Sequence, residues 1–433
     1  MFANILEKLK KNNIEYLQLR FVDNSGILRT KVILKNKFEQ ALKKGTNFSK
    51  AIMNFTAQDK YLDTASYNAA AGDFWAIPDL DSLKFDGYEK DTAIVYCNLF
   101  NADNTPFINC HRSLLKNMIK KTEENWQGKI MAAFEPEFII LDPQKKEPLC
   151  KNQLFSISNI KYFKKIFDEI IVSARKMNIP LIQISSESSL SQFELNIGKQ
   201  TLLKACDDWV TLKNMLKNIA ADNNYLISFL PKPFNNIAGN GLHLHLSINN
   251  EDQNLLLTKD KSNHYLQKKT RSFIAGLLKH GKALTALGAA SVNSYKRFQP
   301  NSWAPTHLNW GIDNRNTFIR VTEPRDNRHL EIRFADASSN PYLFTAALLA
   351  AGLLGVNNEL SLMPASTDNS QNNDYQTLPS HLGEAIDNLK KDQDLQKLLR
   401  KELITEYVKV KEKEWKSYLA EVNSWDKQFI DIY

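Results

Sequence analysis

The residues best suited to chemistry lie in three arginine-containing segments of the 433-residue chain. These segments are Asn293-Ser-Tyr-Lys-Arg-Phe-Gln-Pro300, Trp310-Gly-Ile-Asp-Asn-Arg315 and His329-Leu-Glu-Ile-Arg-Phe-Ala-Asp336. Each arginine stands beside a turn or strand signal, which would hold its guanidinium in a defined place. Arg297, Arg315 and Arg333, together with Glu331, therefore predict a site that handles anions.

Two glutamates lie close together in a strand-like run, in the sequence Glu135-Pro-Glu137. Side chains two apart share one face of a strand, so both carboxylates are aimed at one place. The flanking residues are apolar enough to be buried, and two unpaired buried carboxylates would be costly. A bound cation, or a raised pKa in one carboxyl group, relieves that cost. The alternative is an edge strand with both glutamates in solvent.

Further candidate ligands follow in later segments. Glu187 and Glu194 stand across a short turn, a pattern that on its own also fits a solvated loop. His243 and His245 share a strand face directly after Gly239-Asn-Gly241, where the glycine turn lets a backbone or phosphate approach. A lone histidine is usually a satisfied core residue, but a pair with this spacing is as well explained by a site.

These donors favour a hard divalent cation. Oxygen-rich ligation with few nitrogens and no thiolate favours Mg²⁺ or Mn²⁺ over zinc or copper. Arginines near such ions suit phosphoryl transfer, in which positioning and charge neutralisation do most of the catalysis. The chain has no Gly-x-x-x-x-Gly-Lys-Ser/Thr sequence, so a P-loop NTPase is excluded. For Glu331 and Arg333, which share a strand face, the simpler alternative is a structural ion pair.

The elements that must position these residues fall into two domains, residues 1–105 and 106–433. Alternation from Ile14 to Leu34 around Asp23-Asn-Ser-Gly26 predicts strand, turn and strand, which indicates a small β-rich first domain. The second domain has an α+β pattern. Its expected elements are helices over Ser113–Trp126, Lys161–Asn178, Lys199–Asn223, Pro341–Leu354 and most of Ser380–Asp426, strands over Ile130–Leu141 and Pro180–Ser186, a strand pair near Tyr225–Leu230 and Gly241–Ile248, and a polar loop over Ser366–Thr377.

Composition limits the partners. The chain is 43% hydrophobic and 10% aromatic, as in a soluble globular protein, and no apolar run approaches the roughly 18 residues of a membrane span. Its N-terminus is typical of an amphipathic helix, not a signal peptide, and its four scattered cysteines indicate neither disulfides nor zinc. We therefore expect a cytoplasmic protein without a membrane partner. The formal charge of +8 is dispersed, so we expect a basic solvated surface and no nucleic-acid partner.

The order of these motifs resembles the glutamine synthetase family, in its type I form and the related glutamate–amine ligases such as γ-glutamylpolyamine synthetases. The resemblance covers nearly the whole chain. It rests on Phe134-Glu-Pro-Glu-Phe138, Gly239-Asn-Gly-Leu-His-Leu-His245, Asn293-Ser-Tyr-Lys-Arg297, Asn314-Arg315 with Ile319-Arg320, and Glu331-Ile-Arg-Phe-Ala-Asp-Ala-Ser-Ser-Asn-Pro-Tyr342. It implies a β-grasp N-terminal domain and a catalytic domain whose curved antiparallel sheet forms a metal-lined funnel flanked by helices. It also implies a dodecamer of two hexameric rings, in which a neighbour's N-terminal domain completes each site.

The resemblance assigns roles to individual residues. The residues that match metal ligands form two sets, one of Glu137, Glu187 and Glu194 and the other of Glu135, His243 and Glu331. Those that match ATP contacts are His245, Ser247, Arg315 and Arg320. Those that match substrate contacts are Arg297 and Arg333, for the glutamate carboxylates, with Gly239 and Trp303. Arg297, Arg315 and Arg333 are expected to be catalytic, ATP is expected as a substrate, and the expected cofactor is Mg²⁺ or Mn²⁺, about two or three ions per site.

The reaction that the resemblance implies is attack by the glutamate γ-carboxylate on ATP, followed by capture of γ-glutamyl phosphate by an amine nitrogen. Three departures affect the nitrogen site. Trp303-Ala-Pro305 replaces the family's Glu-Ala-Pro, and an indole cannot bind or deprotonate ammonium. The N-terminal domain lacks the family's Asp-Gly-Ser-Ser loop; the nearest acids are Asp59, Asp63 and Asp73, of which Asp73 aligns best. Ala238 stands where an asparagine usually binds the glutamate backbone.

These departures leave the metal and phosphoryl machinery intact. We therefore expect a ligase that joins glutamate to an organic amine, with Trp303 offering an apolar or cation–π surface. One alternative is a true glutamine synthetase that uses ammonia with substitute acids. The other is a non-catalytic member of the family that senses nucleotide or amino acid, although such a protein need not keep six metal ligands and four arginines.

Overall fold

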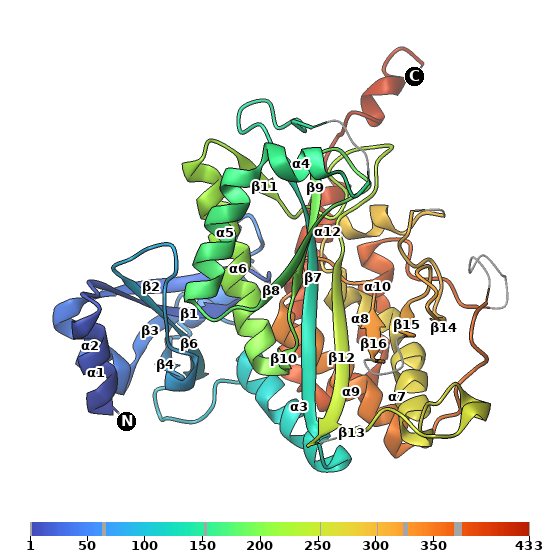
Figure 1. Cartoon of the computed structure of the whole chain (residues 1–433), viewed down its shortest axis with the longest axis horizontal. Helices are drawn as coiled ribbons and strands as arrows, with labels where there is room; N and C mark the ends of the chain where they lie inside the picture. The colour runs from blue at the N-terminus through green and yellow to red at the C-terminus, as the bar shows by residue number, and fades with distance from the viewer. Residues whose placement is uncertain are drawn as a thin grey trace.

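Two β-sheets with helices packed against them make up the protein (Figure 1). The computed structural model describes residues 2–62, 66–150, 154–251, 253–300, 302–323, 328–367 and 375–432. The N-terminal sheet lies at one side of the molecule, and the larger sheet runs through the rest of it. This mixed α+β architecture, with a curved larger sheet, confirms the predicted fold class.

The N-terminal sheet has six strands in the order β2-β1-β6-β4-β3, with β5 beside β6. Its elements are α1 (Phe2–Lys11), β1 (Tyr16–Val22), β2 (Leu28–Leu34), α2 (Phe38–Lys44), β3 (Thr46–Ser49), β4 (Asp73–Pro78), β5 (Lys84–Phe85) and β6 (Thr92–Phe100). β1 is antiparallel to β2 and parallel to β6. In the turn between β1 and β2, the Asp23 carboxylate accepts hydrogen bonds from the backbone of Ser25 and Ile27, and Gly26 has a φ of +75°. The predicted strand, turn and strand are confirmed.

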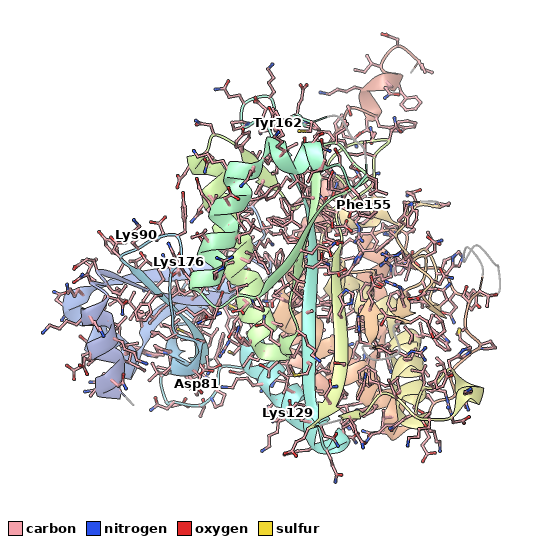
Figure 2. All side chains as sticks on the ribbon, viewed as in Figure 1. Asp81, Lys90, Lys129, Phe155, Tyr162 and Lys176 are labelled. Atoms are coloured by element: carbon pink, nitrogen blue, oxygen red, sulfur yellow. The ribbon has the colours of Figure 1, made fainter. Side chains whose placement is uncertain are left out.

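The larger sheet has ten strands, and most of it follows the order β14-β15-β16-β12-β7-β9-β8. Its strands are β7 (Lys129–Leu141), β8 (Leu181–Ser186), β9 (Gln192–Ile197), β10 (Gln200–Thr201), β11 (Leu226–Ser228), β12 (Leu242–Asn250), β13 (Gln253–Asn254), β14 (Trp310–Ile312), β15 (Ile319–Val321) and β16 (Leu330–Ile332). β7 is the central strand, with β12 along one side and β9 along the other. Phe155 and Tyr162 lie near one end of β7 and Lys129 at the other (Figure 2).

The helices of this part pack partly against the larger sheet and partly against one another. They are α3 (His111–Trp126), α4 (Ile157–Tyr162), α5 (Lys164–Lys176), α6 (Leu202–Asp222), α7 (Lys268–Lys279), α8 (Gly281–Gly288), α9 (Pro341–Asn357), α10 (Leu382–Lys391), α11 (Gln393–Leu398) and α12 (Lys401–Leu419). α9 is buried along nearly its whole length, in keeping with a helix that is apolar on all sides. Among the described residues, no helix combines the length and hydrophobicity that a bilayer span needs.

Three sequence expectations need correction. β11 and β12 do not pair with each other, because β7 is long enough to pair with β11 through residues 139–141 and with β12 through residues 129–136. The larger sheet is not wholly antiparallel, since the loop after β14 returns to its start and places β15 parallel to it. The helix expected over Lys161–Asn178 is two helices, broken at the buried Phe163. The polar loop expected over Ser366–Thr377 lies partly outside the described residues.

One buried network ties the helices behind the larger sheet to the N-terminal sheet. Asp207 on α6 accepts hydrogen bonds from Arg112 Nε at 3.0 Å and from Tyr342 Oη, at the start of α9, at 2.7 Å. Arg112 Nη1 also donates to Asp79 in the N-terminal part, at 2.7 Å. Asn340 caps α9 and donates to the Asp23 carbonyl at 2.9 Å. The position of the boundary between the two domains, at residues 105/106, stays a prediction.

We predict that Asp207→Ala lowers the free energy of unfolding by roughly 3–5 kcal/mol, because it leaves the Arg112 guanidinium buried without its main counter-charge. Chemical denaturation monitored by tryptophan fluorescence measures this. Asp222→Ala is the matched control on the same helix: its carboxylate accepts one exposed bond from Tyr88, so its cost should stay near 1 kcal/mol, about that of a single hydrogen bond. Equal losses in the two variants would contradict the assigned importance of the buried network.

Candidate active site

The register of the larger sheet brings together carboxylates, histidines and an arginine that lie far apart in the sequence. On β7, residues 130, 132, 134 and 138 are buried in the core, whereas Glu135 and Glu137 alternate with them and line a cavity of about 560 Å³ on the other face. β7 is central, so the alternative of a solvent-facing edge strand is wrong. The cross-strand pairs on the cavity face are His243–Glu135, Glu137–Glu194, His245–Glu331 and Arg320–Glu331.

The two histidines lie among the carboxylates. His245 Nε2 is 3.0 Å from Glu135 Oε2, and His243 Nδ1 is 3.6 Å from Glu331 Oε1 and 3.8 Å from Glu135 Oε2. Glu187, in the turn after β8, and Glu194, on β9, line the same cavity, so the solvated-loop alternative for them is also wrong.

The donor atoms fit divalent cations. Two groups, Glu135–His245–Glu331 and Glu135–Glu194–His243, each bring their ligand atoms within 4.8 Å of one another. This grouping differs from the predicted one, because His245 joins a ligand group and Glu135 is shared by both. Neither group includes Glu137 or Glu187, although both line the cavity. The assignment of individual ligands therefore stays a prediction.

Two carboxylates of the cluster are stabilised in the charged form. Burial opposes ionisation of Glu331, but Arg333, His243, His245 and Arg320 outweigh it and lower its pKa to about 2. Arg320 Nη1 donates to Glu331 Oε2 at 2.8 Å, and Arg333 Nη1 bonds Glu331 Oε1. Glu331 and Arg333 thus form the ion pair that was the simpler alternative, and this ion pair is part of the site. For Glu135, burial again opposes ionisation, and the nearby His243 and His245 rings outweigh it and lower its pKa.

Two other carboxylates favour the protonated form. Burial, followed by repulsion from Glu135 and Glu137, raises the pKa of Glu194 to about 9. Burial and the charge of Glu137 raise that of Glu187 to about 7. The cluster therefore holds more carboxylates than its own cations neutralise, and divalent ions could take the place of the bound protons.

The arginines predicted as anion clamps surround the cavity. Arg297, Arg315, Arg320 and Arg333 all line it. Arg333 also holds two loops, donating from Nε to the Arg315 carbonyl at 2.9 Å and from Nη2 to the Trp303 carbonyl at 3.3 Å. Arg297 is buried and donates from Nη1 to the carbonyls of Phe334 and Ala335.

The glycine turn makes room for Arg297. A Cβ on Gly239 would come within 2.4 Å of Arg297 Cγ, and one on Gly241 within 3.1 Å of Arg297 Nη2. The turn was expected to admit a backbone or phosphate; in the structure it admits this guanidinium side chain. Gly241 also donates its backbone N–H to Glu137 Oε2 at 2.7 Å, which orients that carboxylate.

Trp303 borders the cavity with a strained backbone. Its φ of +60° is unusual for a bulky residue, and its side chain is 65% exposed. Leu154, Phe155 and Ala304 add further apolar surface to the same cavity lining. Ala238 also lines the cavity. Ser247 lines a separate cavity with Met131 and Asn249, and its role as an ATP contact stays a prediction.

Three polar residues of the site were not predicted. Asn196 donates to Glu135 and, at 3.4 Å, to Glu194 Oε1. Gln192 donates to the Gly239 carbonyl at 2.9 Å, and His329 Nε2 lies 2.7 Å from His245 Nδ1. Each lies two residues from a predicted ligand, so period-2 alternation along β9 and β16 could have found all three.

Comparison with known proteins agrees with this geometry. The sequence model described as the catalytic domain of glutamine synthetase matches residues 109–430. The chain belongs to the glutamine synthetase family. It is 30% identical to the glutamine synthetase of Thermotoga maritima, over 97% of each protein. It is also 30% identical to the glutamate–methylamine ligase of Methyloversatilis universalis, over 96% of each. A solved GmaS/ADP complex shares the fold with a TM-score of 0.89 at 24% identity, covering 99% of each chain.

We predict that metal binding to this glutamine synthetase family member releases protons. Glu194, with a pKa of about 9, and Glu187, with a pKa of about 7, hold protons at neutral pH that a metal must displace. Their raised pKa values mean that the affinity for Mg²⁺ or Mn²⁺ should rise as the pH increases from 6 toward 9. Isothermal titration calorimetry in buffers of different ionisation enthalpy measures both effects. Binding heats that do not depend on the buffer would contradict this account, and Glu194→Gln should reduce the number of protons released.

Proposed function

We propose that this protein is an ATP-dependent ligase that joins the γ-carboxylate of glutamate to an organic primary amine. The observation that carries the proposal is the combination of a carboxylate-rich, arginine-ringed cavity with an apolar wall that includes Trp303. The first part suits phosphoryl transfer to a carboxylate. The apolar wall suits an amine that carries an alkyl group, in contrast to ammonia.

In the proposed reaction, the γ-carboxylate oxygen of glutamate attacks the γ-phosphorus of ATP and ADP leaves. The amine nitrogen then attacks the carbonyl of γ-glutamyl phosphate, the C–O bond to phosphate breaks, and the amide forms as the nitrogen loses a proton. Arg297 and Arg333 would hold the glutamate carboxylates. Arg315 and Arg320 would neutralise the phosphates, with His245 and Ser247 as further ATP contacts. Such preorganised cations act most strongly where water is excluded.

Divalent Mg²⁺ or Mn²⁺ ions would neutralise phosphate charge during the transfer. The chain's own candidates to hold them are Glu135, Glu137, Glu187, Glu194, His243 and Glu331. Asn196, Gly241 and Arg320 orient three of these carboxylates through the hydrogen bonds described above. Hydrogen bonds of this kind hold metal-ligating side chains in a fixed orientation.

An organic amine is favoured over ammonia by the wall of the cavity. Leu154, Phe155 and Trp303 present apolar or aromatic surface, which suits an alkyl group and an ammonium held by cation–π attraction. Of the N-terminal acids, Asp59 pairs with Arg29 and Asp73 accepts a bond from Asn47, and neither lines the catalytic cavity of its own chain; Asp63 lies outside the described residues.

The test is phosphate release that depends on glutamate, ATP and Mg²⁺, measured with methylamine, ethanolamine, putrescine, spermidine and ammonium in parallel, with product masses confirmed. We expect turnover with an amine and at least about tenfold less with ammonium, because an indole offers ammonium no anionic acceptor. A preference for ammonium would support the alternative of a true glutamine synthetase. Phosphate release with none of these compounds would favour the non-catalytic alternative.

We predict that Trp303→Ala lowers kcat/KM for the preferred amine by about 3- to 30-fold, the worth of one cation–π contact at a partly desolvated site. The KM for ATP should stay unchanged, because the Trp303 backbone that Arg333 contacts is retained. Trp303→Phe keeps an aromatic face and should recover most of the activity. Steady-state kinetics of the three proteins measure this, and an alanine variant as active as the parent would exclude the indole from the amine site.

We also propose that the protein acts in the cytoplasm as a homo-oligomer, a dodecamer of two hexameric rings in which a neighbour completes each site. The C-terminal segment after α12 projects from the body of the chain (Figure 1). Its exposed apolar side chains, between 65% and 71% accessible, are Val422, Trp425, Ile430 and Ile432. Apolar surface of this kind marks a contact with another protein, here a second copy.

We predict that a chain ending at Ala420 forms smaller assemblies than the full chain, because it loses this apolar segment. Light scattering after size-exclusion chromatography measures the mass. Lys427→Ala, which removes a charge from the same segment and keeps its apolar residues, is the matched control and should not change the mass. An unchanged mass for the truncated chain would show that the segment makes no assembly contact.

A further inference from the structure

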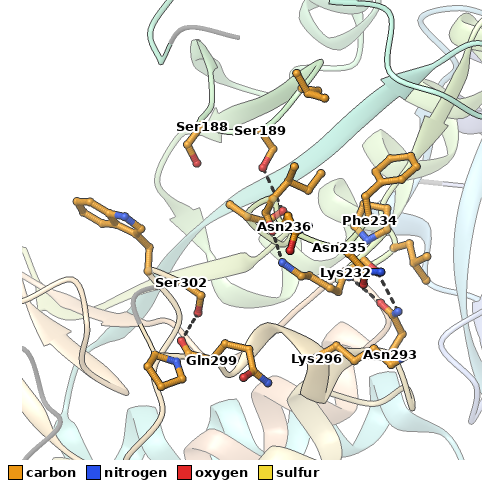
Figure 3. Close-up of a pocket in the computed structure, with 17 residues that line it drawn as sticks. Ser188, Ser189, Lys232, Phe234, Asn235, Asn236, Asn293, Lys296, Gln299 and Ser302 are labelled. Atoms are coloured by element: carbon orange, nitrogen blue, oxygen red, sulfur yellow. Dashed lines mark hydrogen bonds between the residues drawn. The ribbon is translucent and has the colours of Figure 1, made fainter. Parts of the chain in front are cut away.

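A second, larger cavity adjoins the catalytic one. This outer cavity has a volume of about 1320 Å³ and is lined by three segments, residues 188–190, 230–238 and 293–303. Ser188 and Ser189 lie on one wall, with Gln299 and Lys296 facing them from the other (Figure 3). Four residues, Ser188, Ala238, Ser302 and Trp303, line both cavities, so the two spaces are adjacent at this border.

The outer cavity differs in charge from the catalytic one. Its described lining contains Lys232 and Lys296 but no aspartate, glutamate or histidine. The catalytic cavity, in contrast, is lined by Glu135, Glu137, Glu187 and Glu194. The remaining polar lining of the outer cavity consists of amides and hydroxyls, from Ser188, Ser189, Asn235, Asn236, Asn293, Gln299 and Ser302. Such groups bind carboxylates and other anions well, particularly beside two ammonium groups.

The two lysines of the outer cavity make different contacts. The Lys232 ammonium donates to the Ile237 carbonyl, and its backbone exchanges hydrogen bonds of 2.6 and 3.0 Å with the Asn293 side chain. An ammonium has three N–H donors, so this contact leaves Lys232 able to bind a ligand as well. Lys296 is exposed, and its Nζ lies 5.7 Å from the centre of the ring of Tyr418, which is not among the lining residues.

Trp303 stands at the border between the two cavities. Its φ of +60° is a strained conformation, and such conformations persist where the surrounding structure imposes them. Two hydrogen bonds hold this loop in place. Arg333 Nη2 donates to the Trp303 carbonyl at 3.3 Å, and Ser302 Oγ donates to the Arg297 carbonyl at 2.8 Å. An amine whose nitrogen reacts in the catalytic cavity beside Trp303 has the outer cavity next to its far end, because Trp303 lines both spaces.

We infer that the outer cavity binds the far end of the acceptor amine, and that this end carries a carboxylate or a similar anion. The acceptor is then an amino acid or related amino-carboxylate, not a polyamine. This inference rests on the proposed function. A polyamine would place a second ammonium beside Lys232 and Lys296, where the described lining offers no carboxylate, and like charges disfavour that arrangement.

Four amines with the same four-carbon chain test this inference. Butylamine, 4-aminobutan-1-ol, putrescine and 4-aminobutyrate differ only in the far end, which is methyl, hydroxyl, ammonium or carboxylate. We expect 4-aminobutyrate to have the highest kcat/KM and putrescine the lowest, with a difference of about tenfold or more. The reason is that the two lysines attract the carboxylate and repel the ammonium, and charge interactions at short range near a protein surface are large enough for this effect. The double variant Lys232→Met/Lys296→Met should reduce the difference to about threefold or less on the same reasoning. Lys268→Met/Lys279→Met, on α7 and outside both cavities, is the matched control.

The outcomes separate the inference from the proposed function. Equal turnover of all four amines, or a preference for putrescine, overturns the inference and leaves the ligase activity standing. A carboxylate preference that the double variant keeps in full also overturns it. Turnover with none of the four, and none with methylamine, overturns the proposed function itself. If the double variant does not fold, the carboxylate preference of the parent must decline as ionic strength rises, and a preference insensitive to salt counts against the inference.

Discussion

The concentration of carboxylates on one face of the larger sheet is the constraint on which the rest of the structure depends. Like charges at this separation repel, and burial increases the penalty. The protein neutralises part of the cluster with His243, His245 and the arginines around Glu331. For Glu187 and Glu194, burial and the neighbouring carboxylates raise the pKa, and Arg315 offsets only part of this effect at Glu187. A site built in this way is designed around positive charge that must come from outside the chain.

The scaffold follows from that constraint. Repelling side chains keep their places only on rigid elements. β7 supplies one, because it pairs with β12 as far as Pro136 and with β9 from Glu137 onward, so each glutamate lies on a paired residue. Behind the sheet, α6 and α9 are fastened to each other and to the N-terminal sheet through Asp207 and Asn340. The loops that face the substrate are fastened differently. Arg333 bonds Glu331 and also the backbone of the loops at residues 303 and 315. It therefore couples the charge cluster to the loop that carries Trp303.

Much of this was predictable from the sequence because it depends on local periodicity. Alternation of two predicted that Glu135 and Glu137 share a face, and helix patterns located α3, α6 and α9. Cross-strand partners were less accessible, since His243 meets Glu135 only through the register of β12 on β7. Asn196 and His329 are a different case, because each lies two residues from a predicted ligand and the same alternation could have found it. The closeness of Gly239 to Arg297 is likewise a tertiary contact with no local signature.

The most direct test of the central claim, that this cavity activates the γ-carboxylate of glutamate by phosphorylation, follows oxygen. Glutamate labelled with ¹⁸O in its γ-carboxylate is incubated with ATP, Mg²⁺ and the amine that gives the highest turnover, and the released phosphate is analysed by mass spectrometry. The account predicts one ¹⁸O atom in each phosphate released, because the attacking carboxylate oxygen leaves with the phosphoryl group. Phosphate without the label, released at the rate of amide formation, would show that the carboxylate is not phosphorylated and would contradict the account.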